Sequence, residues 1–255
     1  MLSLMASVKL KLVILSFWNK LKLSFNLSGL ASNLKGVMIN QKYIETTKTA
    51  RYYTLGKPAK SLTNIWYVFH GYGQLAKEFI ELFQAIANDK ILFVAPEAMN
   101  KFYARGFTGK IGATWMTKED RENEIKDYVT MINNVYSEVC EIVDMTKVRI
   151  NVLAFSQGGH TAIRWLSEKH IPVNRLILWG SGIPRDISYK SNLLYWNEIK
   201  IKLAVGNSDQ FITEEKLNEE LSFLSEQKIN FELIKYDGFH EIDASNLKNI
   251  YKRIV

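Results

Sequence analysis

Apolar residues from position 44 onward fall into two kinds of stretch, short unbroken runs and longer stretches with helical spacing. Unbroken runs are typical of strands that are buried on both faces and need no polar alternation. They predict strands at residues 65–69, 91–94, 148–155, 176–179, 201–205 and 231–236. Two further short strands are expected at 44–47 and 51–55, before a turn at Gly56-Lys57-Pro58.

The longer stretches predict helices at 77–88, 119–143, 158–169, 213–227 and 244–255. Thr213 is the expected N-cap of the fourth, with Glu214 and Glu215 in its first turn. Strands that alternate with such helices predict an α/β fold, in which a mainly parallel central sheet carries helices on both faces. Ligand sites of these sheets lie at the carboxyl ends of the strands. Reactive residues that directly follow a strand are therefore the candidates for a site.

A nucleophile elbow is predicted where the 148–155 strand runs into Ser156 and Gly158-Gly159 leads into a helix. Such a turn requires small residues two positions before and after the serine, and Ala154 and Gly158 meet this need. The helix N-terminus would present backbone N–H groups to a developing oxyanion. The alternative is an ordinary strand-to-helix turn in which serine is the N-cap.

A second glycine-flanked turn, His70-Gly71-Tyr72-Gly73, follows the 65–69 strand. The expected oxyanion hole consists of the backbone N–H groups of Tyr72 and Gln157, with a neighbour of Tyr72 as the alternative donor. Each donor is worth about 3 kcal/mol of transition-state stabilisation. His70 precedes the nucleophile, and we expect its side chain to hold the loop by a hydrogen bond.

Two later strands each end at a residue that would complete a catalytic triad. Asp209 follows the 201–205 strand, and His240 follows the 231–236 strand after a glycine. The order Ser156, Asp209, His240 is the one expected of a nucleophile, an acid and a histidine on this kind of sheet. The histidine would take the serine proton, and the carboxylate would fix the imidazole tautomer.

The other candidates for these roles are less well placed. His160 lies on the helix after Ser156, and His170 ends that helix. Asp237 and Asp243 are alternative acids, but both are too close to His240 in sequence to belong to a separate strand end. The alternative role of Asp209 is to cap the helix that follows it.

Six short sequences resemble the phospholipase/carboxylesterase family, which includes the acyl-protein thioesterases and small bacterial esterases. They are HGYG at 70–73, FVAPEA at 93–98, GATW at 112–115, AFSQGG at 154–159, GNSDQFI at 206–212 and GFHEI at 238–242. SQGG is the most specific, and the resemblance spans residues 65–255. It implies an α/β-hydrolase fold without a separate cap domain, and a cofactor-free esterase that acts on short or medium acyl esters or thioesters. Ala154 departs from the usual glycine, which should alter the turn only slightly.

The aromatic and basic stretch at 99–111 lies where members of this family differ most, so substrate choice does not follow from the resemblance. We expect Phe102, Phe107 and Trp115 to line an acyl or alcohol pocket, with Arg105 and Lys110 available to an acidic group. The alternative is a surface loop packed by its own aromatic residues.

The net charge of +7 changes this interpretation little. Residues 1–37 contain five lysines and no acidic residue, which leaves +2 for the rest of the 255-residue chain. The sequence has no arginine-rich stripe of the kind that indicates nucleic-acid binding. We therefore expect an extension at 1–37 and one α/β-hydrolase domain at 38–255. Three interpretations of the extension stay open: a secretory signal, a basic segment on a membrane surface, or an upstream segment outside the working protein, with Met38 as the start.

The remaining expectations concern partners and location. A single cysteine, Cys140, excludes an internal disulfide and suits a cytoplasmic location. The scattered histidines indicate no metal site, and no phosphate-binding glycine loop follows the first strand. We expect a small-molecule ester or thioester substrate, no cofactor, and a monomer or homodimer. The competing functions are acyl transfer with the same triad and a non-catalytic binding protein that keeps the fold.

Overall fold

The protein is described here by a computed structural model that covers residues 39–254. The expected extension at 1–37 lies outside the described residues. Two compact units divide the chain, residues 1–48 and 49–255. In the described part of the first unit, residues 39–48, the chain forms no helix or strand. The strand expected at 44–47 is therefore wrong: Ile44 is 91% exposed, and a β-branched residue favours a strand only where its side chain is packed against neighbours.

The second unit contains a seven-stranded sheet in the order β1-β3-β2-β6-β7-β8-β9. Its strands are β1 (Tyr52–Leu55), β2 (Asn64–Phe69), β3 (Ile91–Pro96), β6 (Arg149–Phe155), β7 (Val173–Trp179), β8 (Lys200–Gly206) and β9 (Phe231–Tyr236). Only β1 runs antiparallel to its neighbour, β3. The α/β fold with a mainly parallel sheet is confirmed.

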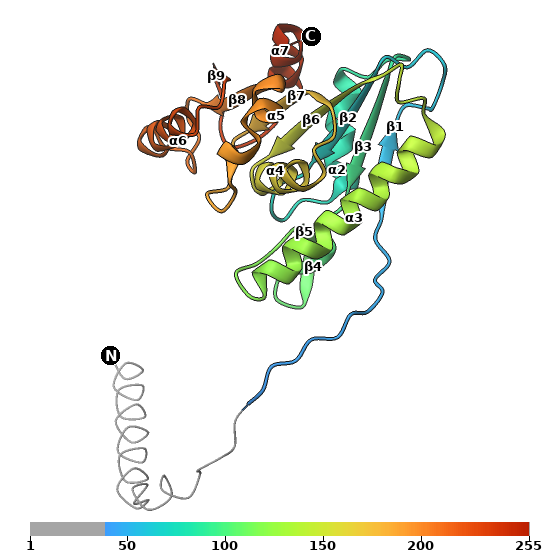
Figure 1. The fold of residues 1–255 in the computed structure, drawn as a ribbon, viewed down its shortest axis with the longest axis vertical. Coiled ribbons are helices and arrows are strands. Elements are labelled where there is room, and N and C mark those ends of the chain that lie inside the picture. Colours follow the sequence, from blue (N-terminus) through green and yellow to red (C-terminus); the bar gives the residue numbers. More distant parts are fainter. Residues whose placement is uncertain (1–38, 255) are drawn as a thin grey trace, which may run out of the picture. The chain divides into compact units, whose positions relative to one another are not determined.

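Helices cover both faces of this sheet (Figure 1). They are α2 (Ala76–Glu81), α3 (Arg121–Ile142), α4 (Gln157–Lys169), α5 (Leu193–Glu198), α6 (Glu214–Glu226) and α7 (Ala244–Ile254), with 3-10 helices η1 (Leu82–Ala85) and η2 (Tyr189–Asn192). Thr213 caps α6 by accepting a hydrogen bond from the Lys216 N–H, as expected.

The two faces of β2 show why its sequence has no polar alternation. Ile65, Tyr67 and Phe69 belong to the core on the side of α3 and α4, whereas Trp66 and Val68 belong to the core on the side of α2 and α7. All five side chains are buried. Because successive strand residues point to opposite faces, a strand between two helical layers must be apolar throughout.

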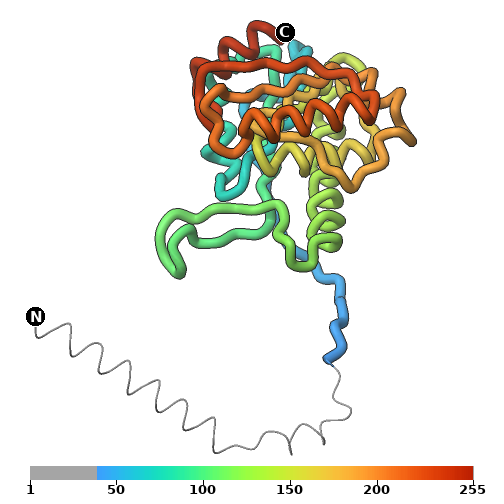
Figure 2. The backbone as a smooth tube through the Cα atoms, turned by 90° about the vertical axis from the view of Figure 1, so that its left-hand side faces the viewer, coloured from blue at the N-terminus to red at the C-terminus, as the bar shows by residue number. Residues whose placement is uncertain are grey.

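Three further features differ from the pattern expected from sequence. The helix expected at 77–88 ends at Glu81 and continues only as η1, and η2 with α5 was not expected. The stretch after β3, for which the pattern predicts no strand, is a two-stranded antiparallel hairpin of β4 (Asn100–Arg105) and β5 (Thr108–Thr114). Figure 2 shows this hairpin standing out from the body of the unit as an arm. Its exposed strands pair with each other and not with the main sheet, so they lack the unbroken apolar run of a buried strand.

No helix within residues 39–254 combines the length and apolar character that a membrane span requires.

Candidate active site

Ser156 lies at the sharp turn between β6 and α4, with backbone angles φ 52° and ψ −121°. This is a strained conformation for a residue with a Cβ, and such conformations cluster at functional sites. Gly158, two residues after Ser156, allows the turn because it has no Cβ. A Cβ there would lie 2.6 Å from the Phe69 carbonyl oxygen and 2.7 Å from the His70 carbonyl oxygen. The elbow therefore needs glycine there because α4 packs directly against the end of β2.

The structure brings Ser156, His240 and Asp209 into one hydrogen-bonded chain. His240 Nε2 lies 2.9 Å from Ser156 Oγ, and His240 Nδ1 lies 2.7 Å from Asp209 Oδ2. The other carboxylate oxygen, Asp209 Oδ1, accepts hydrogen bonds from the N–H groups of Phe211 and Ile212 at 2.8 and 2.9 Å. Asp209 is buried and fully partnered, so its orientation is fixed.

The loops that carry Asp209 and His240 meet because β8 and β9 end side by side. Asn207 and Ser208 donate backbone hydrogen bonds to the carbonyls of Tyr236 and Gly238. A Cβ at Gly206 would lie 2.4 Å from the Gly238 carbonyl oxygen, so the two loops are in direct contact. This packing places a strand-end acid beside a strand-end histidine that is far away in sequence.

Two aromatic rings hold the imidazole of His240. The ring of Phe155 lies 4.9 Å from it on one side, and that of Phe211 lies 4.8 Å from it in an edge-on arrangement. Gly180, at φ +56°, makes room nearby, because a Cβ there would come within 3.0 Å of the imidazole. The sequence reasoning did not single out Phe211 or Gly180, although GNSDQFI includes Phe211.

The alternative acids and histidines lie in other settings. Asp243 accepts hydrogen bonds from the N–H groups of Ser245 and Asn246 at the start of α7, and Asp237 is exposed. His170 ends α4 in a left-handed conformation and packs edge-on against Tyr195. Burial lowers the pKa of His160 to about 4, so this residue is uncharged at neutral pH.

His70 holds the loop after β2, the role we expected of it. The imidazole is fully buried: Nδ1 donates to the Gly71 carbonyl at 2.8 Å, and Nε2 accepts from the Ala98 N–H at 3.1 Å. Trp115 stacks on the ring at 4.9 Å. Burial lowers the pKa of His70 to about 4, which keeps it neutral and preserves both hydrogen bonds.

Around Tyr72, the neighbouring backbone N–H groups are already used. The Gly71 N–H donates to Gln74 Oε1 at 2.7 Å, and the Gly73 N–H donates to the Ala113 carbonyl at 2.8 Å. Among the described residues, the Tyr72 N–H has no acceptor. The N–H of Gln157 opens α4, where the first N–H groups have no acceptor within the helix.

The side chain of Gln157 ties this helix start to the end of β5. Its Oε1 accepts from the Trp115 N–H at 3.1 Å, and its Nε2 donates to the Met116 carbonyl at 2.8 Å. The loop after β2 also reaches β5 through Ala113, so one strand supports both expected oxyanion donors.

The three expected pocket residues lie in different places. Phe102 stacks on Tyr72 with ring centres 5.1 Å apart, beside the loop after β2. Phe107 is 96% exposed at the tip of the hairpin. Trp115 is buried in the core, and its indole N–H donates to the His70 carbonyl. Lys110, which we expected to be available to an acidic group, pairs with Glu78 at 2.5 Å.

Glu97 is a supporting residue that the sequence reasoning did not identify, although it lies in the quoted FVAPEA motif. Its buried carboxylate pairs with Arg51 at 2.6 Å and accepts from the Ala76 N–H at the start of α2. It therefore joins the edge of the sheet to α2, just beyond the loop of Tyr72.

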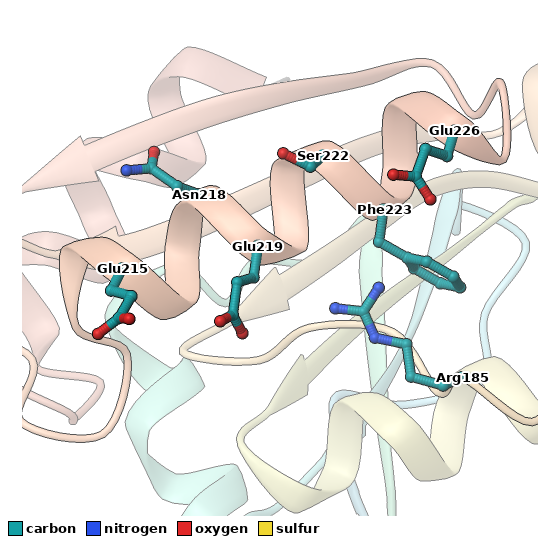
Figure 3. Close-up of a pocket in the computed structure, with 7 residues that line it drawn as sticks. All are labelled: Arg185, Glu215, Asn218, Glu219, Ser222, Phe223 and Glu226. Atoms are coloured by element: carbon teal, nitrogen blue, oxygen red, sulfur yellow. The ribbon is translucent and has the colours of Figure 1, made fainter.

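Two cavities share Arg185 and Glu219 in their walls. One, of about 870 Å³, runs along the surface of α6, and Figure 3 shows its acidic side chains and Phe223 on that helix with Arg185 opposite. The other, of about 660 Å³, contains His160, Ser181 and Ile212 in its wall, close to the triad. Among residues 39–254, no three His, Cys, Asp or Glu side chains gather in a way that would hold a metal ion.

The sequence profile of the Phospholipase/Carboxylesterase family matches residues 53–255. The chain belongs to this family, whose members are carboxylic ester hydrolases of the α/β-hydrolase fold. No curated protein sequence matches it.

Solved structures agree with this fold. Acyl-protein thioesterase 2 of Zea mays is similar with a TM-score of 0.63 and 14% identity, over 81% of this chain and 98% of the other. A carboxylesterase of Mesorhizobium loti is similar with a TM-score of 0.60 and 14% identity, over 80% of this chain and 94% of the other. The Bacillus cereus carboxylesterase is similar with a TM-score of 0.57 and 12% identity, over 91% of this chain and 100% of the other. At such identities the likeness concerns the fold alone.

Proposed function

We propose that the protein is a serine ester hydrolase that works through an acyl-enzyme on Ser156, with His240 as the base and Asp209 as the orienting acid. The observation that carries the proposal is the hydrogen-bonded chain from Ser156 Oγ through both nitrogens of His240 to Asp209 Oδ2. A neutral serine is a weak nucleophile, and this arrangement is the one that activates it.

In the first half-reaction, Ser156 Oγ attacks the carbonyl carbon of the ester while its proton moves to His240 Nε2. Asp209 accepts the Nδ1–H and stabilises the imidazolium. When the tetrahedral intermediate collapses, the bond to the leaving group breaks, and Nε2 gives its proton to the departing alcohol or thiol. A water molecule then repeats these steps against the acyl-enzyme, which releases the carboxylic acid and restores Ser156.

The negative oxygen of each tetrahedral intermediate would be held by the N–H groups of Tyr72 and Gln157. Two observations support this pair: both N–H groups are without an internal acceptor among the described residues, and both are braced by β5. The positive end of α4 adds to the stabilisation.

We propose short or medium acyl esters or thioesters as substrates. Phe102 is the expected pocket residue best placed to contact them, because it stacks on Tyr72. Phe107, at the exposed hairpin tip, would reach only a substrate that extends far from the triad. The free Cys140 supports the further proposal of a cytoplasmic location.

The test compares wild type with Ser156→Ala on p-nitrophenyl esters of increasing acyl length, together with labelling by a fluorophosphonate. We expect hydrolysis and labelling by wild type, and loss of both in the variant. Ser167→Ala is the matched control, since Ser167 lies on the same helix and its hydroxyl bonds only the Arg164 carbonyl. It should keep full activity.

The competing functions give other outcomes. Acyl transfer would yield a new ester or amide when an alcohol or amine acceptor is supplied, which product analysis detects. A protein that binds without catalysis would turn over no ester and leave Ser156 unlabelled.

A further inference from the structure

The cavity of about 660 Å³ is built from the same segments that hold the candidate triad. Met116 in its wall accepts a hydrogen bond from Gln157, and Ile212 donates one to Asp209. Ser181 packs so closely on Gly159 that a Cβ there would come within 2.1 Å of its hydroxyl. The cavity wall therefore includes residues that directly contact the elbow helix and the Asp209 loop, although the three triad residues do not line it. Its volume lies within the ordinary range of ligand sites.

Cationic side chains predominate in the wall of this cavity. The cations are Lys118, Arg121, Arg164, Arg185 and Lys216, and the carboxylates are Asp186, Glu219 and Glu220. Within the described part of the chain, neither Lys118 nor Lys216 pairs with a carboxylate; Lys216 instead donates to the Phe211 carbonyl.

Arg185 is already paired with another residue of the wall, Glu220, at 2.7 Å. Its guanidinium lies 3.7 Å from the centre of the Phe223 ring. Figure 3 shows its side chain directed at that ring, on the α6 side. The unbalanced charge must therefore come from the other arginines and the lysines.

Arg121 and Arg164 share the carboxylate of Asp186. Arg121 also pairs at 2.5 Å with Glu122, whose side chain is 82% exposed and lies outside the cavity wall. Asp186 Oδ2 lies 2.6 Å from Arg121, and Asp186 Oδ1 lies 3.1 Å from Arg164. Burial acts to raise the pKa of Asp186, but the hydrogen bonds from the two arginines outweigh it and lower the pKa to about 2. Within the cavity wall itself, the two arginines thus face one carboxylate, that of Asp186.

Arg164 makes this imbalance costly. The residue is only 8% exposed, and its Nε has no hydrogen-bond acceptor among the described residues. A buried guanidinium is stable only when anionic or polar acceptors surround it. His160, in the same wall, is uncharged at neutral pH and makes no competing ion pair.

We propose that this cavity is a subsite for a negatively charged group of the substrate, a carboxylate held by Arg121 and Arg164 with Lys118 nearby. The proposal rests on the proposed hydrolase function and names its substrate class: esters or thioesters that carry an anion a few bonds from the scissile carbonyl. An arginine pair accommodates such a group through charge-assisted hydrogen bonds.

Two pairs of substrates test this, each matched in size and different in charge. On the acyl side, 4-nitrophenyl hexanoate is compared with the 4-nitrophenyl monoester of adipic acid. On the alcohol side, the methyl ester of 4-(butyryloxy)benzoic acid is compared with the free acid. We expect kcat/KM to favour the charged member in one of the pairs by about tenfold, and the pair concerned tells which side of the ester enters the cavity.

Two variants with opposite expected effects test whether the preference for the charged ester comes from this cavity. Arg121→Gln should abolish most of the preference, measured as the ratio of kcat/KM for the charged ester to kcat/KM for the neutral ester. Asp186→Asn should strengthen the preference, because it removes the internal competitor for the two arginines. If Asp186→Asn does not fold, Arg121→Gln alone decides, since Arg121 is partly exposed. Arg149→Gln, at the start of β6, is the control and should alter neither substrate.

The outcomes separate the two proposals. No advantage for the charged member in either pair, or an advantage that Arg121→Gln leaves intact, overturns the anionic subsite. The hydrolase proposal survives in both cases, because the neutral esters are turned over. Failure of the hydrolase proposal is recognised separately, as no turnover of any of the four esters and no fluorophosphonate labelling of Ser156.

Discussion

The two carboxylate oxygens of Asp209 have separate partners. Oδ1 receives two backbone N–H groups from its own loop, and Oδ2 faces His240 Nδ1. The first set fixes the side chain, so that the second oxygen can set the tautomer of the imidazole. This division allows the acid to be altered chemically without moving it.

Asp209→Asn is expected to lower kcat by about four orders of magnitude at neutral pH. The amide oxygen can keep the two backbone hydrogen bonds, while its NH₂ group would face His240 and demand an acceptor at Nδ1. His240 would then carry its proton on Nε2 and could not take one from Ser156. Steady-state kinetics on a p-nitrophenyl ester measure the loss.

Asp243→Asn is the control, because Asp243 accepts only at the start of α7. It should keep kcat and cost about 1 kcal/mol of stability at most. A similar loss of kcat in both variants would contradict the role of Asp209.

His70 gives a prediction about pH and stability. Its pKa is about 4 in the folded protein and close to the ordinary 6.5 when unfolded, because burial disfavours the charged form. Above pH 6.5 both states are neutral and His70 has no effect of this kind. As pH falls from 6.5 towards 4, the imidazole takes up a proton only in the unfolded state. The free energy of unfolding therefore decreases by on the order of 3 kcal/mol.

Urea unfolding of wild type and His70→Gln at several pH values between 7 and 4 measures this. The glutamine can donate and accept as the imidazole does but does not titrate. Carboxylates titrate alike in both proteins, so the difference between their free energies of unfolding isolates His70. We expect wild type to lose stability faster as pH falls, and parallel curves would refute this.

At the scale of elements, β5 is the strand that positions the reactive loops. It leaves the exposed hairpin at Gly112 and ends at Thr114, beside both Gly73 and Gln157. A Cβ at Gly112 would lie 2.8 Å from the Gly73 Cα and carbonyl oxygen, which are backbone atoms that can yield only by moving the loop of Tyr72.

Gly112→Ala is therefore expected to lower kcat by about 100-fold, the usual effect of one misplaced oxyanion donor. Substrate KM should change little, since the acyl and alcohol contacts remain. Gly106→Ala, at the hairpin tip, meets no atom within 4 Å and should cost only about 1 kcal/mol for its positive φ, with kcat unchanged. Circular dichroism and thermal melts verify that both variants fold.

The contrast between elbow and hairpin also explains how far the sequence alone predicts this molecule. Ser156 with Gly158 is a local signal, because one tight turn fixes both residues within a few positions. The residues of the predicted triad end three buried strands, and parallel strands bring their ends together. The strands at 100–105 and 108–114 lack that signal, since they pair only with each other and stay exposed.

Other parts could not be found by pattern. The stretch at 44–47 has strand-like residues, but no pattern tells whether a partner strand exists. The cavity beside the triad joins Arg121, Arg164 and Asp186, which come from two helices and a loop. Its excess charge becomes visible only after folding has brought these segments together.

At the scale of the whole molecule, every residue with a role in the proposed function lies within residues 49–254. The complete sheet, both cores and the Ser156–His240–Asp209 chain belong to this part. Even the edge contact of Arg51 with Glu97 is included. We therefore expect residues 49–255 to fold and act without the preceding residues.

A chain that begins at Thr49 should consequently keep the melting temperature and the kcat/KM of the full chain. The comparison also tests residues 1–37, whose five lysines and short apolar runs leave a membrane-surface role open. Both chains would be sedimented with vesicles of neutral and of anionic lipid. Binding of the full chain alone, stronger on anionic vesicles, would assign that role to the extension, and equal binding would exclude it. A large loss of stability in the shorter chain would show that the fold extends further towards the N-terminus than its sheet does.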